Sequence, residues 1–328
     1  MTIGYLTTLH GLPVHDFPEV DEGSGPLPPP GEVAWRLARN QPLGDAESFE
    51  TCWHRFLDTV DSARVRALVL GAGAYGTGSD GDGEGPAETA GRLVAAADRL
   101  TGLEALYLAD LGHGEGELSW IVQDDVTPIL SAYPYPYLRE LGVRGSGGGS
   151  EGAPGLRLGP LRHEHLRVLR LENRGLPGEV ARGLAASDLP GLRHLDLWPG
   201  EEEYGRTTTL AGLAPLLDGD RLPAPRHLGL QNCEMHDEVA AAVAGAPVVA
   251  RLTSLHLSLG TLSDAGAEAL LGGRPLTRLQ ELDLYHHFLS DPMMRRMREA
   301  LEPFGVKVNL DGQEEAEEDE PRYIAVGE

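Results

Sequence analysis

The sequence predicts an α/β solenoid: a curved, right-handed superhelix of strand-helix units, with parallel strands on its concave face and helices on its convex face. Two observations carry this prediction. The pattern apolar-x-x-apolar-x-apolar recurs nine times between residues 65 and 310, and helical sequence separates the copies. A strand-helix unit can bury its leucines only against its neighbours, so such a chain stacks into one continuous core.

The nine copies define the predicted strands. They read VRALVL, LEALYL, LRELGV, LRVLRL, LRHLDL, PRHLGL, LTSLHL, LQELDL and GVKVNL. Their fourth residues fall at 68, 106, 141, 169, 195, 228, 255, 282 and 308, so successive copies lie 26 to 38 residues apart. Within each copy, positions one, four and six are expected in the core, and positions two, three, five and seven face outward on the concave side.

The segments between the copies predict the convex helices. Five of them read DVTPILSAY, PGEVARGLAAS, DEVAAAVAG, SDAGAEALLGG and DPMMRRMREALEP, and several start at Ser, Asp or Pro, which are common residues at helix N-termini. A glycine-rich stretch at 145–155, GSGGGSEGAPG, is expected to be a flexible insertion between the third and fourth copies.

Three regions are predicted: a capping segment at 1–62, the solenoid at 63–312, and an acidic tail at 313–328. The first 62 residues lack the repeat but contain two expected strands, YLTTLHGLPVHDF and EVAWRLARN, and one expected helix, DAESFETCWHRFLDTV. A solenoid needs an atypical terminal unit to cover its core, so we interpret this segment as an N-terminal cap. The tail carries EEAEEDE and is expected to be disordered, although the apolar YIAV after it could dock.

The spacing of the late copies and the sequence from Pro225 onward, such as LTSLHLSLGTLSDAGAEALL, resemble leucine-rich repeats of the ribonuclease-inhibitor-like class. Cys233, Gly260 and His287 stand where many such repeats carry Asn or Cys, so Cys233 is expected to be a buried repeat residue. LTTLHGLPVHDFP, LSWIVQDDVTPIL and RYIAVGE also resemble a family of acidic bacterial leucine-rich-repeat proteins. This resemblance implies a fold and no chemistry.

Composition narrows the classes of partner. The formal net charge is −24, from 27 basic and 51 acidic side chains, which disfavours nucleic acid and anionic membranes as partners. The N-terminus lacks a basic and apolar signal segment, no stretch is long enough to span a bilayer, and two cysteines build no disulfide framework. A cytoplasmic protein is expected.

A glycine-rich stretch after the first copy, residues 71–85, matches two nucleotide or ion motifs in part. GAGAYG follows a strand as in a dinucleotide-binding turn, but helical sequence begins only near Pro86. Asp80, Asp82 and Glu84 begin like a calcium loop, but Gly91 stands where the twelfth-position glutamate belongs. An inserted loop is the favoured interpretation, and a calcium- or nucleotide-responsive regulator remains an alternative function.

Neither metal nor catalytic motifs stand out. His163-Glu164-His165 and His286-His287 lack further ligands at zinc-like spacing, so neither a metal site nor any cofactor is expected. No nucleophile elbow or distinct carboxylate pair is present, and the chain is therefore expected not to be an enzyme.

Cations gather at the positions expected on the concave face. Four consecutive copies carry Arg at position two, and Arg with Trp and Tyr is typical of binding hot spots. Glu140, Glu172 and Asp196 could instead pair with these arginines within the surface. The candidate partner-binding residues are Arg139, Arg144, Arg167, Arg170, Arg193, His194, Trp198, Arg226, His227, His256 and Tyr285.

The sequence therefore predicts a non-enzymatic scaffold or adaptor that binds a protein or peptide, with an acidic one favoured, on the concave face. The chain's own acidic C-terminal tail is a rival occupant of that face. A purely structural subunit of a larger assembly is a further alternative.

Overall fold

The computed structural model describes residues 4–20, 25–38, 47–75, 85–112, 118–131, 135–145, 155–316 and 321–326. These residues form one 12-stranded sheet in which the strands lie in sequence order. The pair β1–β2 is antiparallel, and each later pair of neighbours is parallel. The strands are β1 Thr8–Leu9, β2 Leu12–Asp16, β3 Ala34–Leu37, β4 Ala67–Leu70, β5 Ala105–Leu108, β6 Glu140–Arg144, β7 Val168–Glu172, β8 His194–Leu197, β9 His227–Leu230, β10 Ser254–His256, β11 Glu281–Asp283 and β12 Lys307–Asn309.

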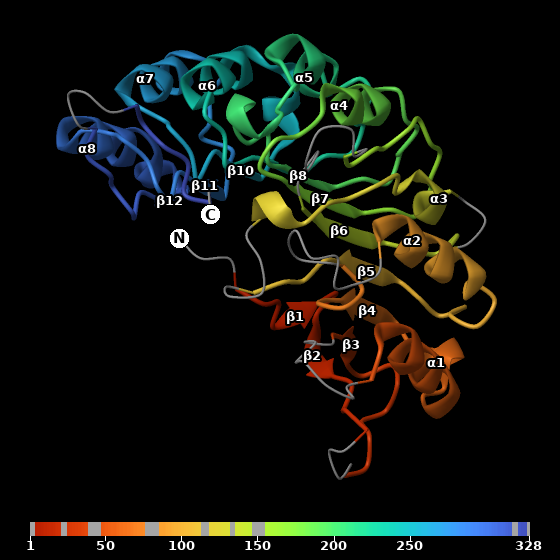
Figure 1. Ribbon diagram of the computed structural model, residues 1–328. Coiled ribbons are helices and arrows are strands. Elements are labelled where there is room, and N and C mark those ends of the chain that lie inside the picture. Colours follow the sequence, from red (N-terminus) through yellow and green to blue (C-terminus); the bar gives the residue numbers. More distant parts are fainter. Residues whose placement is uncertain are drawn as a thin grey trace.

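The sheet lines the inner side of an arc, and the helices cover its outer side (Figure 1). Within the described residues the helices are α1 Phe49–Thr59, α2 Pro86–Ala95, α3 Thr127–Leu130, α4 Gly178–Ala185, α5 Leu210–Leu217, α6 His236–Gly245, α7 Asp264–Gly272 and α8 Asp291–Leu301. Four of them begin at a hydroxyl N-cap whose side chain accepts a backbone N–H: Ser48, Thr209, Ser263 and Ser290. The predicted α/β class, with a mostly parallel sheet and a solenoid-like succession of units, is confirmed.

The repeated leucines account for the regular register. The fourth residue of each copy pairs with the fourth residue of the next, as in Leu141 with Leu169 and Leu169 with Leu195. Eight of these nine side chains are buried and Val308 is half-buried, and all nine predicted copies form strands, β4 to β12. Because each leucine contacts only neighbouring units, truncating one to alanine should cost about 2–5 kcal/mol of local stability.

The N-terminal segment continues the same sheet. Strand β3 pairs in parallel with β4, and α1 lies over it through an aromatic cluster in which Trp35 meets Phe56 edge to face at 5.8 Å. The preceding β1–β2 hairpin turns at His10 and Gly11, both of which have positive φ. It then packs Leu9 against Val69 and Tyr107 on the concave side. Strands β1, β2 and β3 thus extend the sheet at its N-terminal edge.

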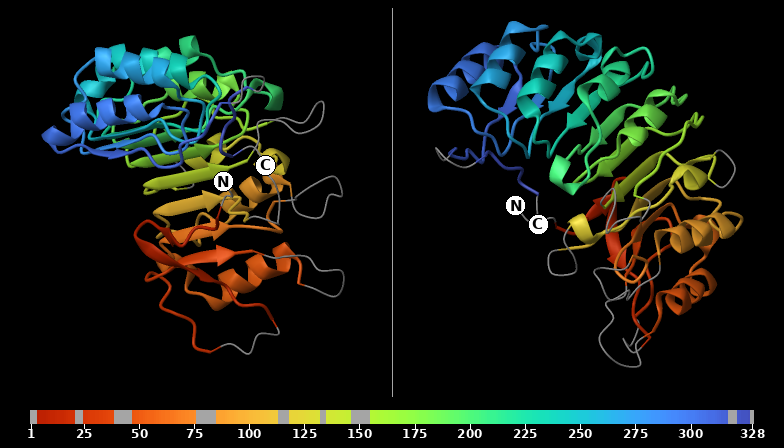
Figure 2. Two further views of the ribbon diagram at one scale, coloured as in Figure 1. Left: turned by 90° about the vertical axis from the view of Figure 1, so that its left-hand side faces the viewer. Right: turned by 45° about the horizontal axis from the view of Figure 1, so that its top comes forward.

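The C-terminal segment also lies on the inner side of the arc, as the turned views show (Figure 2). Residues 321–326 pack against the loops that follow β9, β10 and β11, and Ile324 and Val326 are buried. The acidic residues 317–320, which belong to the tail that the sequence predicts to be disordered, lie outside the described residues. Ala325 and Val326 share a buried apolar cluster with Leu118 and Leu259, which favours an ordered position for the YIAV segment.

The glycine-rich stretch only partly falls within the described structure. Gly73 takes a positive φ, Ala74 and Tyr75 are buried, and α2 begins at Pro86. The helix therefore does not open at the glycines, as a dinucleotide turn would require. The candidate calcium residues Asp80, Asp82 and Glu84, and most of the insertion at 145–155, lie outside the described residues.

Two further expectations concern burial. Cys233 is completely buried, as predicted for a repeat residue, and burial raises the pKa of its thiol to about 12. Among the helices described, none combines the length and apolar character needed to cross a membrane.

Candidate functional site on the concave face

The predicted column of arginines lies along one edge of the sheet. Each arginine at position two immediately precedes a strand, so the column follows the edge at which the strands begin. We call Arg139, Arg167, Arg193 and Arg226 the arginine row. At ~4.8 Å between parallel strands, the four positions span roughly 14 Å.

The arginine row is only partly neutralised. The Nε of Arg139 lies 3.4 Å from a Glu104 carboxylate oxygen. Arg167 donates to the Glu164 carbonyl at 2.9 Å, and Arg226 donates to the Arg251 carbonyl at 3.3 Å. Among the described residues, the exposed Arg193 guanidinium makes no hydrogen bond or ion pair. A partner carboxylate could therefore bind at this edge without first breaking an internal ion pair at Arg193.

The first half of the concave face, β3 to β6, is covered by the chain's own N-terminal segment. Arg144, a predicted partner-binding residue, is only 4% exposed. It donates to Glu172 at 2.9 Å and to the Leu111 carbonyl at 3.0 Å, and it lies 3.6 Å from Asp110. Arg144 is thus a buried structural cation and is not accessible to a partner, because the segment from Gly4 onward lies over it.

The middle of the face is a chain of alternating charges. Arg170 donates to the buried Glu140, and its Nε lies 3.7 Å from Asp196. His10, from the turn between β1 and β2, contacts Glu140 at 3.3 Å. Burial lowers the pKa of Arg170, but Glu140 and Asp196 outweigh burial and hold it above its ordinary value. The sequence alternative, that these acids pair with arginines within the surface, therefore applies to Arg170.

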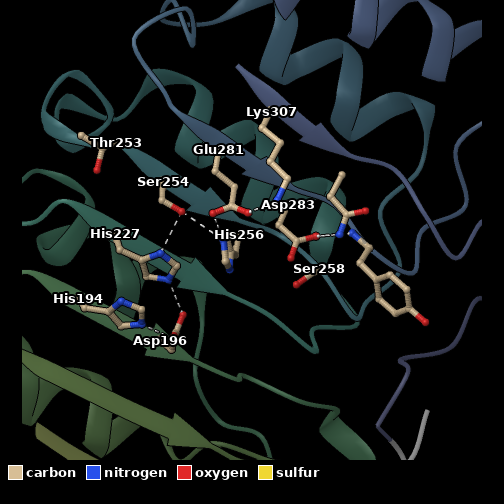
Figure 3. A network of polar contacts seen from close by, with 12 residues as sticks. His194, Asp196, His227, Thr253, Ser254, His256, Ser258, Glu281, Asp283 and Lys307 are labelled. Atoms are coloured by element: carbon tan, nitrogen blue, oxygen red, sulfur yellow. Dashed lines mark hydrogen bonds and ion pairs between the residues drawn. The ribbon is translucent and has the colours of Figure 1, made fainter. Parts of the chain in front are cut away.

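The second half of the face carries a histidine cluster, which we define as His194, Asp196 and His227 with the adjoining Ser254 and His256 (Figure 3). His194 and Asp196 are two residues apart on β8 and so share one face, and the parallel register places His227 of β9 beside His194. The two imidazole rings stack at 3.8 Å between centroids, with 6° between their planes.

The Asp196 carboxylate lies between the two imidazoles. His194 Nε2 is 2.5 Å from one of its oxygens, and His227 Nε2 is 2.8 Å from the other, to which Gln231 also donates at 3.0 Å. Burial raises the pKa of Asp196, but the hydrogen bonds from His194 and His227 outweigh burial and hold that pKa well below its usual range. Asp196 is therefore an ionised carboxylate fixed by three donors.

Hydrogen bonds continue from His227 to β10, and ion-pair contacts extend from there to β11 and β12. His227 Nδ1 lies 3.1 Å from Ser254 Oγ, which lies 3.1 Å from His256 Nε2, and His256 is 3.8 Å from Glu281. Lys307 on β12 approaches Glu281 at 3.6 Å. Burial lowers the pKa of His256, and the neighbouring His227 lowers it further. Together with Glu281 and Lys307, the histidine cluster forms a polar strip over the five strands β8 to β12.

Ser254, His227 and Asp196 are linked in the order of a hydrolase triad, but the backbone N–H of Ser254 is not free to serve as an oxyanion donor. The backbone N–H of Ser254 donates to the Arg226 carbonyl at 3.0 Å within the sheet. Acyl transfer needs free backbone or side-chain donors close to the nucleophile. The geometry therefore gives no support to a serine hydrolase at this position.

The two predicted aromatic anchors contact the chain's own C-terminal segment. Trp198 and Tyr285 pack against a cluster made of Leu118, Leu259, Ala325 and Val326. The tail was predicted as a rival occupant of the concave face. Its described end lies at the edge where the strands finish, opposite the arginine row, because the chain leaves β12 at that edge.

The tail crosses three equivalent positions in consecutive repeats. Asn232, Leu259 and His286 follow β9, β10 and β11, and each has a positive φ that turns the chain after its strand. The Asn232 side chain both donates to and accepts from the Val326 backbone, at 3.0 Å each. Leu259 O accepts from Ala325 N–H at 2.9 Å, and His286 contacts the Tyr323 carbonyl.

The two histidine pairs noted in the sequence do not converge. His163 is buried against the Tyr135 carbonyl, whereas its neighbour His165 is exposed beside Tyr137. His286 turns to the Tyr323 carbonyl, and His287 turns to the Leu310 carbonyl at 3.1 Å. The residues that do converge are His194 and Asp196 on β8 and His227 on β9. Asp196 and His227 are 31 positions apart in the sequence.

Sequence reasoning could have found this grouping from the register of the copies. His194 and His227 are both third residues of consecutive copies, LRHLDL and PRHLGL, and Asp196 is the fifth residue of the first. The sequence-based prediction places His194 and His227 among the partner-binding residues and Asp196 among the possible arginine partners, and it does not join the three in one site. Asn232 carried no signal, because its partner is 94 residues away.

Comparisons with known proteins add information on the fold alone. No protein-family model and no curated protein sequence matches the chain. A protein from Bacteroides fragilis of known crystal structure is similar in fold, with a TM-score of 0.73 and 23% sequence identity. The similarity covers 90% of this chain and 78% of that protein. Nearly the whole chain therefore shares its architecture with this solved structure.

Proposed function

We propose that the chain is a leucine-rich-repeat solenoid, with an N-terminal cap, that serves as a non-enzymatic scaffold for a protein or peptide partner. The leucine-rich-repeat class is supported by the buried leucines at fixed positions and by units of 26 to 33 residues from the fourth copy onward. The observation that carries the scaffold function is the unequal coverage of the concave face.

The proposed recognition surface comprises the arginine row and the half-buried polar side chains of β7, β8 and β10. The N-terminal hairpin occupies the first strands of the face, whereas Arg193 is exposed and His194 and His256 are half-buried. Guanidinium groups at fixed spacing suit carboxylates, so an acidic peptide segment lying along the row is the favoured partner. Among the described residues, we find no contact that favours the alternative functions, a purely structural role or a calcium-responsive loop.

Site-directed photo-cross-linking tests the location of binding. A photoreactive residue at position 193 should capture the partner, and the same residue at position 296, on helix α8 of the convex side, should not. Arg296 is a matched control because it is also an exposed arginine, paired there with Glu268. Equal capture from both positions would contradict the concave surface.

Charge reversal tests the chemistry of binding. The triple variant Arg167→Glu, Arg193→Glu and Arg226→Glu should lose the captured partner, while Arg296→Glu should keep it. Both variants must show the wild-type circular dichroism spectrum. Unchanged capture by the triple variant would remove the arginine row from the proposal.

A further inference from the structure

The histidine cluster has the composition of a transition-metal site. We propose that His194, Asp196 and His227 bind one divalent first-row transition metal ion, for which Zn²⁺ is the test ion. Their ligand atoms all lie within 4.8 Å of one another. Two imidazole nitrogens and one carboxylate form a ligand set typical of zinc and of non-haem iron(II). This inference does not depend on the proposed partner binding.

The backbone makes room for the carboxylate ligand. Gly229 lies opposite Asp196 on β9, and a Cβ at that position would come within 1.9 Å of an Asp196 carboxylate oxygen. A side chain at position 229 would therefore push the carboxylate away from the imidazoles. The absence of a side chain at Gly229 leaves space for the Asp196 carboxylate, which a chance grouping of His and Asp on a surface would not require.

Neighbouring side chains also hold the proposed ligands in place. His227 Nδ1 lies 3.1 Å from Ser254 Oγ, so this nitrogen can carry the hydrogen while Nε2 binds the ion. Gln231 fixes one carboxylate oxygen of Asp196. Metal-binding histidines commonly use their second nitrogen in this way, and loss of such partners typically weakens metal binding 10- to 100-fold. The nearby Arg170 cation is paired with Glu140, which limits its repulsion of the ion.

Binding requires a small rearrangement that the structure permits. Ligand atoms around a tetrahedral zinc ion lie about 3.3 Å apart, which is wider than the present 2.5 and 2.8 Å contacts. The stacked rings cannot both direct Nε2 lone pairs at one ion, so one ring must turn. His194 is the ring that turns, because its side chain is 26% exposed and that of His227 is 10% exposed. The remaining coordination position faces the concave side, where water or a carboxylate could bind.

Calorimetric titration of the chelator-treated, full-length protein with Zn²⁺ tests the site. We expect one ion per chain, and at least about tenfold weaker binding for His194→Gln, Asp196→Asn and Gly229→Ala. His165→Gln is the matched control, because it removes an exposed histidine outside the cluster and should leave the affinity unchanged. Each variant is accepted only if its melting temperature is within a few degrees of wild type.

A second readout needs no variant. Zn²⁺ should shift the imidazole NMR signals of His194 and His227, and it should leave those of His165 in place. No binding by the wild-type protein, or shifts at other histidines only, would overturn the proposal. The proposal would also be overturned if the His194→Gln and Asp196→Asn variants still bound Zn²⁺ and Ca²⁺ displaced it. That result would place the Zn²⁺ ion on the carboxylates of the acidic tail.

Discussion

The two halves of the concave face use similar side chains in different surroundings. On β3 to β6, Arg36 and Arg144 face Asp110 beneath the N-terminal segment, and these three side chains are almost fully buried. On β7 to β12, His194, His256 and Lys307 remain partly exposed. Charge in the first half serves the fold, because a buried ion pair must be kept complete, whereas charge in the second half remains accessible to solvent.

Arg144→Met should have the largest effect. It leaves the half-buried Glu172 without its arginine and leaves Asp110 with Arg36 as its remaining cation, so the free energy of unfolding should fall by about 3–5 kcal/mol. Urea denaturation measures the change. A loss below about 1 kcal/mol would show that the covered half is not held together by this ion pair.

Acidification should weaken the second half more than the first. Burial is the main cause that lowers the pKa of His236 to about 4, and His286 lowers it further. The hydrogen bond to Leu230 and the charge of Asp237 raise this pKa, but they do not offset burial. Burial also lowers the pKa of His287. The unfolded chain takes up these protons near pH 6.5, so stability is full above that pH and falls between pH 6.5 and 4.

At pH 5 the loss from His236 alone should be about 2 kcal/mol, at about 1.4 kcal/mol per pH unit. Hydrogen exchange at pH 7 and pH 5, corrected for intrinsic rates, should show faster opening around α6 and β9 than around β3 and β4. Equal changes in both regions would contradict the difference between the halves.

The docked tail should make a smaller contribution. Asn232→Gly removes two hydrogen bonds to Val326 while tolerating the positive φ, and it should cost about 1 kcal/mol. In a chain truncated after residue 320, the same change should cost much less, because its partner is gone. Thermal melting of the four proteins forms a double-mutant cycle, and additive effects would show that Asn232 does not act through the tail.

Arg193→Ala should have the smallest effect on stability. Its guanidinium has no polar contact among the described residues, so the free energy of unfolding should change by less than about 0.5 kcal/mol. This variant is the counterpart of Arg144→Met, because both remove an arginine that the sequence assigns to one surface. A large loss would mean that the arginine row is a structural feature.

The sequence by itself determined the repeat and its register. LRHLDL and PRHLGL place leucines at fixed intervals, and period-two side-chain alternation then fixes which residues are buried. The α/β class, all nine repeat strands and the burial of Cys233 follow from these local rules. The same rules identified His194 and His227 as residues of the concave face.

Only the tertiary structure decided which of those residues are accessible and which act together. Arg144 and Arg193 look alike in the sequence, but a segment that begins 140 residues before Arg144 covers it. His194, Asp196 and His227 converge because β8 and β9 pair in register, and Asn232 meets Val326 because the tail returns across three loops. Repeat periodicity describes contacts between neighbouring units, such as β8 and β9, whereas the cover over Arg144 and the contact between Asn232 and Val326 depend on where the non-repeating ends of the chain pack.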